Sequence, residues 1–243
     1  MSTTASKKDS NSGLNDDIDF DYGFGNFNPD EVEVEDTINV QFVVDVSGSV
    51  GGYVNELNSG LNEFVERMQK SHVADKVFVS VVVFNNDIKV LTGYQPIDQV
   101  PTFDFGQHIY GTTALYGGTR VALENALNYR EGLENAGVNC KTLVFVMTDG
   151  GDNEPSKGNP SEVKSIIDNL LQEERNFASF ETMLFGINKS EETEFNHAAS
   201  MMGIKNVVTI DNSADEIKRM INFISSSVSG ASGNGNAISV VNF

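Results

Sequence analysis

The stretch Val43-Val44-Asp45-Val46-Ser47-Gly48-Ser49 decides the fold of this chain, because an apolar run passes directly into a group of oxygen-bearing side chains. The residues from Ile38 to Val44 are mainly β-branched or aromatic, which is typical of a strand buried on both faces. Asp45, Ser47 and Ser49 then supply one carboxylate and two hydroxyls. Hard oxygen donors of this kind suit Mg²⁺, Ca²⁺ or Mn²⁺ better than Zn²⁺. The stretch therefore predicts a divalent-metal site at the end of a buried strand.

The residues after this stretch leave a second interpretation open. Gly51 and Gly52 let the backbone turn before a helix whose apolar residues recur at spacings of three and four. Asp and Ser are also preferred at the N-cap of a helix. Asp45 or Ser49 would then cap the next helix instead of binding a metal.

Length and composition define the class of protein. With 243 residues, the chain has room for one α/β domain of roughly 190 residues and two tails. The single cysteine, Cys140, excludes an intramolecular disulfide and agrees with a reducing cytoplasm. No apolar segment follows the two lysines near the N-terminus, and no run of residues approaches the length of a membrane span. We therefore expect a cytoplasmic protein without a membrane-spanning segment.

The charge of the chain excludes one class of partner. The formal net charge is -19, with 35 acidic and 16 basic residues, whereas contacts with nucleic-acid phosphates need Lys and Arg. Cations or basic partners are the natural counterparts of such a chain. Many of the acids lie in residues 1–36, interleaved with aromatic side chains. We interpret 1–36 as an acidic, largely disordered leader, and the alternative is a segment that docks on a basic partner.

The rest of the chain alternates between strand and helix patterns. Buried strands are predicted at 38–44, 76–84, 141–147, 180–187 and 207–210, with a short edge strand at 88–91. Helices are predicted at 53–70, 114–127, 160–175, 191–201 and 217–228. This order indicates a three-layer, Rossmann-like α/β fold, with a mostly parallel central sheet, one antiparallel edge strand and helices on both faces. The domain is placed at 37–229, before a Gly/Ser/Asn tail with an apolar tip at 230–243 that folds back or is captured by another protein.

Two further segments combine hydroxyl and acidic side chains. Gly111-Thr112-Thr113-Ala114-Leu115 places two hydroxyls where a helix begins, so that a helix cap is again the alternative. The third buried strand ends in Thr148-Asp149-Gly150-Gly151-Asp152. Because ligands of an open parallel sheet bind at the carboxyl ends of its strands, we expect Asp45, Thr113 and Asp149 to meet there.

Together, DVSGS at 45–49, the threonine of GTTAL and the aspartate of MTDGGD resemble the metal-ion-dependent adhesion site of von Willebrand factor A domains. The resemblance covers about residues 37–229. It assigns five metal-site residues: Asp45, Ser47, Ser49, Thr113 and Asp149. Thr113 is preferred to Thr112 because the family threonine directly precedes Pro or Ala and then Leu.

The resemblance also implies a mechanism and a function. Ser47, Ser49 and Thr113 would bind Mg²⁺ directly, whereas Asp45 and Asp149 would act largely through coordinated waters. An Asp or Glu carboxylate of a partner protein would then complete the octahedral shell. The expected function is a metal-dependent protein-interaction module that is not an enzyme. Asp152 would be either an acceptor behind the metal ligands or a solvated side chain.

Two other functions stay open. An aspartate after the first strand also suits a Mg²⁺-dependent phosphoryl-transfer enzyme, although phosphatases of the haloacid-dehalogenase type carry DxD where this chain has Ser47, and no P-loop, GxSxG or GxGxxG is present. A structural subunit could keep the site permanently occupied by a neighbouring chain. Within the family, the chain is similar in style to cytoplasmic bacterial and phage proteins of the tellurite-resistance type, linked to stress response, and to those paired with MoxR-like AAA+ ATPases.

Overall fold

The structure is a computed structural model that describes residues 36–172 and 179–231. Apart from their inner ends, the predicted leader at 1–36 and tail at 230–243 lie outside these residues, as do the last three residues of the helix predicted at 160–175. No helix within the described ranges is both long enough and apolar enough to cross a membrane.

Six strands form one sheet in the order β3-β2-β1-β4-β5-β6. They are β1 (Thr37–Asp45), β2 (Val77–Phe84), β3 (Ile88–Pro96), β4 (Cys140–Thr148), β5 (Phe180–Ile187) and β6 (Asn206–Ile210). All neighbouring pairs are parallel except β2 with β3, so the predicted mostly parallel sheet with an antiparallel edge strand is confirmed. β3 runs to Pro96 and not only to residue 91, because an edge strand tolerates a residue that lacks an N–H group.

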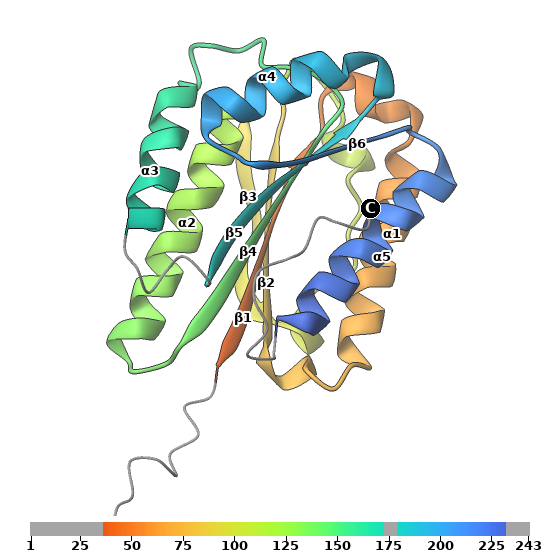
Figure 1. Cartoon of the computed structure of the whole chain (residues 1–243). Coiled ribbons are helices and arrows are strands. Elements are labelled where there is room, and N and C mark those ends of the chain that lie inside the picture. The colour runs from red at the N-terminus through yellow and green to blue at the C-terminus, as the bar shows by residue number, and fades with distance from the viewer. Residues whose placement is uncertain (1–35, 173–178, 232–243) are drawn as a thin grey trace, which may run out of the picture. The chain divides into compact units, whose positions relative to one another are not determined.

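The helices form two layers around this sheet, as predicted (Figure 1). One face is covered by α1 (Val54–Gln69) and α5 (Ala214–Gly230). The other is covered by α2 (Leu115–Asn135), α3 (Pro160–Gln172) and α4 (Glu192–Met202). Strand β1 lies in the centre, with β2 on one side and β4 on the other.

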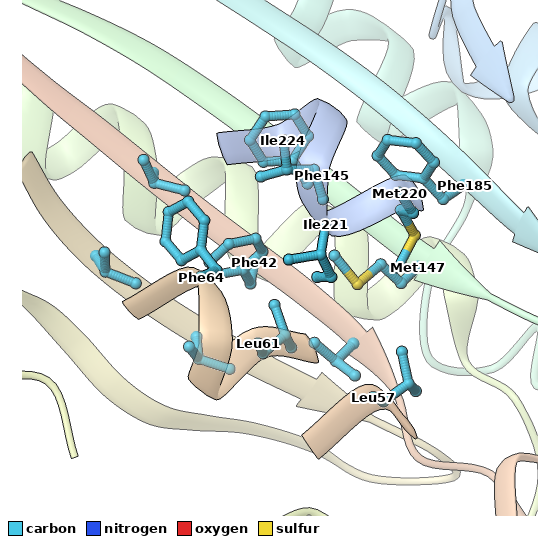
Figure 2. Close-up of a cluster of buried hydrophobic side chains, with 14 of the residues drawn as sticks. Phe42, Leu57, Leu61, Phe64, Phe145, Met147, Phe185, Met220, Ile221 and Ile224 are labelled. Carbon is cyan, nitrogen blue, oxygen red and sulfur yellow. The ribbon is translucent and has the colours of Figure 1, made fainter. Parts of the chain in front are cut away.

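Phenylalanine rings pack among aliphatic and methionine side chains in the core between the sheet and the α1–α5 layer (Figure 2). The ring of Phe42 on β1 meets Phe64 of α1 edge-on, with centroids 5.1 Å apart, and stacks on Phe145 of β4 at 6.0 Å. Gly60 lets the two helices approach closely, because a Cβ atom there would lie 2.8 Å from the Ile221 side chain. This packing fixes β1, and with it the position of Asp45 at the end of the strand.

We expect Phe42→Ala to lower the free energy of unfolding by about 3–5 kcal/mol, because it leaves a cavity beside the two fully buried rings of Phe64 and Phe145. Urea unfolding followed by circular dichroism measures this loss. Phe78→Ala is the matched control, because Phe78 lies on the neighbouring strand but is only half-buried. Equal losses for the two variants would contradict the central role of Phe42.

Candidate metal centre

Asp45 is the last residue of β1, and its side chain is buried, with 1% of its surface exposed. Its Oδ1 accepts a hydrogen bond from the backbone N–H of Ser47 at 2.8 Å. Its Oδ2 accepts one from the hydroxyl of Thr148, the last residue of β4, at 2.6 Å. Each carboxylate oxygen thus has a donor, and the group is held in one orientation.

Asp45 and Ser49 do not cap the helix that follows. The chain first forms a short 3-10 helix at Gly48–Gly52, and α1 then begins behind Tyr53 without any side-chain cap. The capping interpretation of this stretch is therefore wrong.

Hydrogen bonds connect the hydroxyls after β1 to the carboxylate after β4. The hydroxyl oxygens of Ser47 and Ser49 lie 3.2 Å apart. The Ser49 hydroxyl donates to Oδ1 of Asp149 at 2.8 Å. Four of the five predicted residues are therefore brought together by the loops that follow two adjacent strands.

Thr113, the fifth predicted residue, is buried and is held through its backbone. Its N–H donates to Oδ1 of Asn153 at 2.7 Å, and its carbonyl oxygen accepts from the N–H of Asn153 at 2.9 Å. Among the described residues, no hydrogen bond joins the Thr113 side chain directly to the other four. Asn153 instead ties Thr113 to the loop that begins at Asp149.

The neighbours of Asn153 extend this connection. Oδ1 of Asp152 accepts from the N–H of Tyr116 in the first turn of α2 at 3.1 Å. Oε1 of Glu154 accepts from the hydroxyl of Thr112 at 2.5 Å. We call Asp152, Asn153 and Glu154 the clasp, because these three consecutive residues hold the segment 112–116.

The clasp corrects two sequence interpretations. The N-cap of α2 is Ala114, and no side chain of its own segment caps it, so the prediction that Thr112 or Thr113 acts as a helix cap is wrong. Asp152 is not simply solvated, and none of its hydrogen bonds goes to a predicted metal-site residue of the described chain. It instead satisfies an N–H group at the N-terminus of α2 from a different loop.

Gly111 makes the third connection between the loops. Its carbonyl oxygen accepts from the N–H of Gly48 at 3.2 Å. Its φ is +73°, a backbone conformation that favours glycine, and a Cβ atom would lie 1.8 Å from Oδ1 of Asn86. Gly111, Thr148 and Asn153 were missed as site residues by the sequence reasoning, although Gly111 and Thr148 lie within segments that it had singled out and Asn153 directly follows one.

The electrostatics of the centre favour a cation. Burial raises the pKa of Asp45 to about 6 against the opposing effect of the hydrogen bonds from Thr148 and Ser47, and burial also raises the pKa of Asp149. The buried hydroxyl of Tyr53 lies beside Asp149 without a hydrogen bond of standard geometry, and its pKa is raised by burial and by the two carboxylates. No Lys, Arg or His of the described residues forms an ion pair with Asp45 or Asp149.

The donor set fits a hard divalent cation. Nowhere in residues 36–172 and 179–231 do three or more His, Cys, Asp or Glu side chains form a group that could hold a metal ion. The structure instead brings together two carboxylates and the hydroxyls of Ser47 and Ser49, to which Thr113 would add a third hydroxyl. Such oxygen-only sets suit Mg²⁺, Ca²⁺ or Mn²⁺.

A family comparison agrees with this arrangement. The model of the von Willebrand factor type A domain matches residues 39–226. The chain therefore belongs to the von Willebrand factor type A domain family. A search of curated proteins finds no match.

Solved structures of pilus proteins share the fold. The pilus adhesin SpaC from Lactobacillus rhamnosus GG is 14% identical with a TM-score of 0.59, and the match covers 80% of this chain and 30% of SpaC. The minor pilin PilB from Streptococcus sanguinis is 11% identical with a TM-score of 0.55, covering 84% of this chain and 64% of PilB. The vWF domain of the type V pili tip protein Mfa5 from Porphyromonas gingivalis is 10% identical with a TM-score of 0.52. This match covers 83% of this chain and 98% of the Mfa5 domain. The chain thus spans less than two thirds of SpaC and of PilB.

The cytoplasmic location expected from the sequence is contradicted by these neighbours, which are an adhesin, a pilin and a pilus tip protein and are therefore surface-exposed. The expectation rested on one cysteine and on the lack of an apolar segment near residue 1, and neither is a property of the fold or of the site. The likeness to tellurite-resistance proteins and the MoxR-like ATPase partner stay predictions.

The buried charge of Asp45 predicts a pH dependence of stability in the metal-free protein. Because its pKa in the folded state is about 6, above the ordinary 3.8, the folded state binds the proton more tightly than the unfolded state. The contribution of this group to stability is therefore greatest below pH 4 and is lost as the pH rises to 6. We expect Asp45→Asn to be about 3 kcal/mol more stable than the unsubstituted chain above pH 6 and equal to it near pH 4.

Urea unfolding in EDTA between pH 4 and pH 8 measures this difference. The matched control is Asp98→Asn, which removes an exposed carboxylate from a short 3-10 helix. A stability difference that does not change with pH would show that the Asp45 carboxylate is not responsible.

Proposed function

We propose that this chain is a metal-dependent protein-interaction module that holds Mg²⁺ and uses it to bind a carboxylate of a partner protein. Domains of its family are commonly protein-interaction modules. The observation that carries the proposal is the buried carboxylate of Asp45, which lies close to Asp149 without a cationic partner among the described residues. A buried charge of this kind is costly unless a cation compensates it. The hydroxyls around it complete an oxygen-only set.

The contacts of each residue suggest its role. Ser47, Ser49 and Thr113 would hold the ion directly through neutral hydroxyls. Both oxygens of Asp45 already accept a hydrogen bond, which favours action through a coordinated water over direct ligation. A bound Mg²⁺ would supply one exchangeable position for a carboxylate oxygen of the partner. Because three ligands are neutral, the ion would keep enough positive charge to attract that group.

Isothermal titration calorimetry with MgCl₂ tests the proposal on protein stripped with EDTA. We expect one binding event for the unsubstituted chain and at least tenfold weaker binding for Ser47→Ala, because that change removes a metal-binding oxygen. Ser59→Ala is the matched control, since Ser59 is exposed on α1. Undiminished binding by Ser47→Ala, or no binding by the unsubstituted chain, would refute the proposal.

The clasp leads to a separate prediction for a residue that would not touch the ion. Asn153→Ala removes the side-chain oxygen that accepts from the Thr113 N–H. We expect the Kd for Mg²⁺ to rise about tenfold, because groups that orient metal ligands typically affect affinity on this scale.

Asn159→Ala is the control for this prediction. It removes a comparable turn-forming oxygen, one that accepts from the N–H of Ser161 on the same connection. If both variants bind Mg²⁺ as tightly as the unsubstituted chain, the clasp does not position the metal centre.

We also propose that the chain performs no catalysis. Ser47 and Ser49 contact another hydroxyl and a carboxylate, and no histidine of the described residues forms a hydrogen bond with either. Hydrolysis of p-nitrophenyl phosphate in Mg²⁺ is the direct assay. Turnover that Asp45→Asn abolishes would favour the phosphoryl-transfer alternative.

A further inference from the structure

Four acidic side chains contact residues of the loops that form the centre, and we call them the acidic rim: Asp87, Asp152, Glu154 and Glu194. Oε1 of Glu154 contacts Thr112, next to Thr113, and Oδ2 of Asp87 lies 3.5 Å from the hydroxyl of Tyr110. Glu194, at the start of α4, lies against Gly151, where a Cβ atom would be 2.4 Å from its Oε1. The rim thus draws on the loop after β2, the loop after β4 and the first turn of α4.

Few cations balance this rim. Lys157 lies 3.6 Å from Oδ1 of Asp87, and this is the one ion pair that a rim residue makes within the described ranges. Lys189, in the short 3-10 helix after β5, pairs instead with Asp211 and Glu216. The six carboxylates of the centre and the rim therefore exceed the combined charge of Lys157 and one divalent cation by three.

A second feature, the hydroxyl of Tyr53, points to a ligand at the centre. The hydroxyl of Tyr53 is buried beside Asp149, and the side chain is 3% exposed, yet the hydroxyl forms no hydrogen bond of standard geometry with any described residue. A buried polar atom of this kind normally has a partner. The acidic rim is therefore treated as the border of the candidate metal centre and not as a separate binding site.

We infer that the carboxylate captured by the metal centre belongs to a basic segment, in which Lys or Arg residues flank an Asp or Glu. This inference rests on the proposed function and adds the chemistry of the partner to it. The carboxylate meets the ion, and the flanking cations meet the rim. Complementary charges at such a rim mainly set specificity and the rate of encounter.

The same charges disfavour acidic ligands. Two unit charges about 6 Å apart in water interact by about 0.7 kcal/mol, or roughly threefold in affinity per pair, when screening is weak. An acidic segment would bind about threefold more weakly for each contact with the rim, whereas a basic segment would bind about threefold more tightly. A segment as acidic as residues 1–36 of a second copy is therefore a poor occupant.

Selection from a displayed peptide library tests the inference on the full chain. The probe is a heptapeptide library with a fixed central Asp and random flanks, bound in MgCl₂ and eluted with EDTA. We expect Lys and Arg to be enriched about threefold or more in the eluted flanks. The variant Asp87→Asn/Glu194→Gln, which leaves the clasp intact, should lose this enrichment.

The control variant is Glu66→Gln/Glu131→Gln, which removes two exposed acids from α1 and α2 away from the centre and should keep the enrichment. Mg²⁺ binding of each protein is measured in parallel by calorimetry. Neutral or acidic flanks, or equal enrichment by the rim variant, would overturn the inference alone. An absence of EDTA-eluted peptides from a protein that binds Mg²⁺ would overturn partner binding at this centre and the inference with it.

Discussion

The hydrogen bond from the Thr148 hydroxyl to Oδ2 of Asp45 is the interaction on which the candidate metal centre depends. It joins the last residues of two adjacent parallel strands, so it exists only when β1 and β4 pair in their observed register. A shift of one residue would turn Asp45 to the other face of the sheet. The core around Phe42 therefore determines the geometry of the site, although it lies several residues away.

In the proposed function, the centre would bind its ion at the expense of the stability of the metal-free fold. Without a metal, burial destabilises the ionised form of Asp45, and the raised pKa of this group reflects that cost. Metal binding would remove this penalty, so folding and binding would be thermodynamically linked. Functional sites that contain an unfavourably buried charge commonly lower the stability of the folded protein in this way. The strong core of the α1–α5 face supplies the stability that such a site requires.

The sequence predicted the fold, and the meeting of the polar loops after β1 and β4, because both follow from local patterns. The run from Ile38 to Asp45 shows a buried strand and its polar end within one stretch, and the structure places that strand in the middle of the sheet. The clasp could not be predicted, because Asn153 and Thr113 are 40 residues apart and their pairing depends on how two loops pack. The cellular location was predicted wrongly, since the cysteine count and the hydropathy near residue 1 on which that prediction rested do not determine it.

The clasp also connects the metal centre to the cooperative unit formed by α2. Asp152 satisfies the Tyr116 amide, and Asn153 the Thr113 amide, so opening of the loop after β4 would leave the first turn of α2 without these acceptors. Local opening of the loop and fraying of the helix are then one event with one free energy. The amides of Thr113 and Tyr116 become natural reporters of ligand arrival, because their hydrogen exchange would slow whenever the loop is held closed.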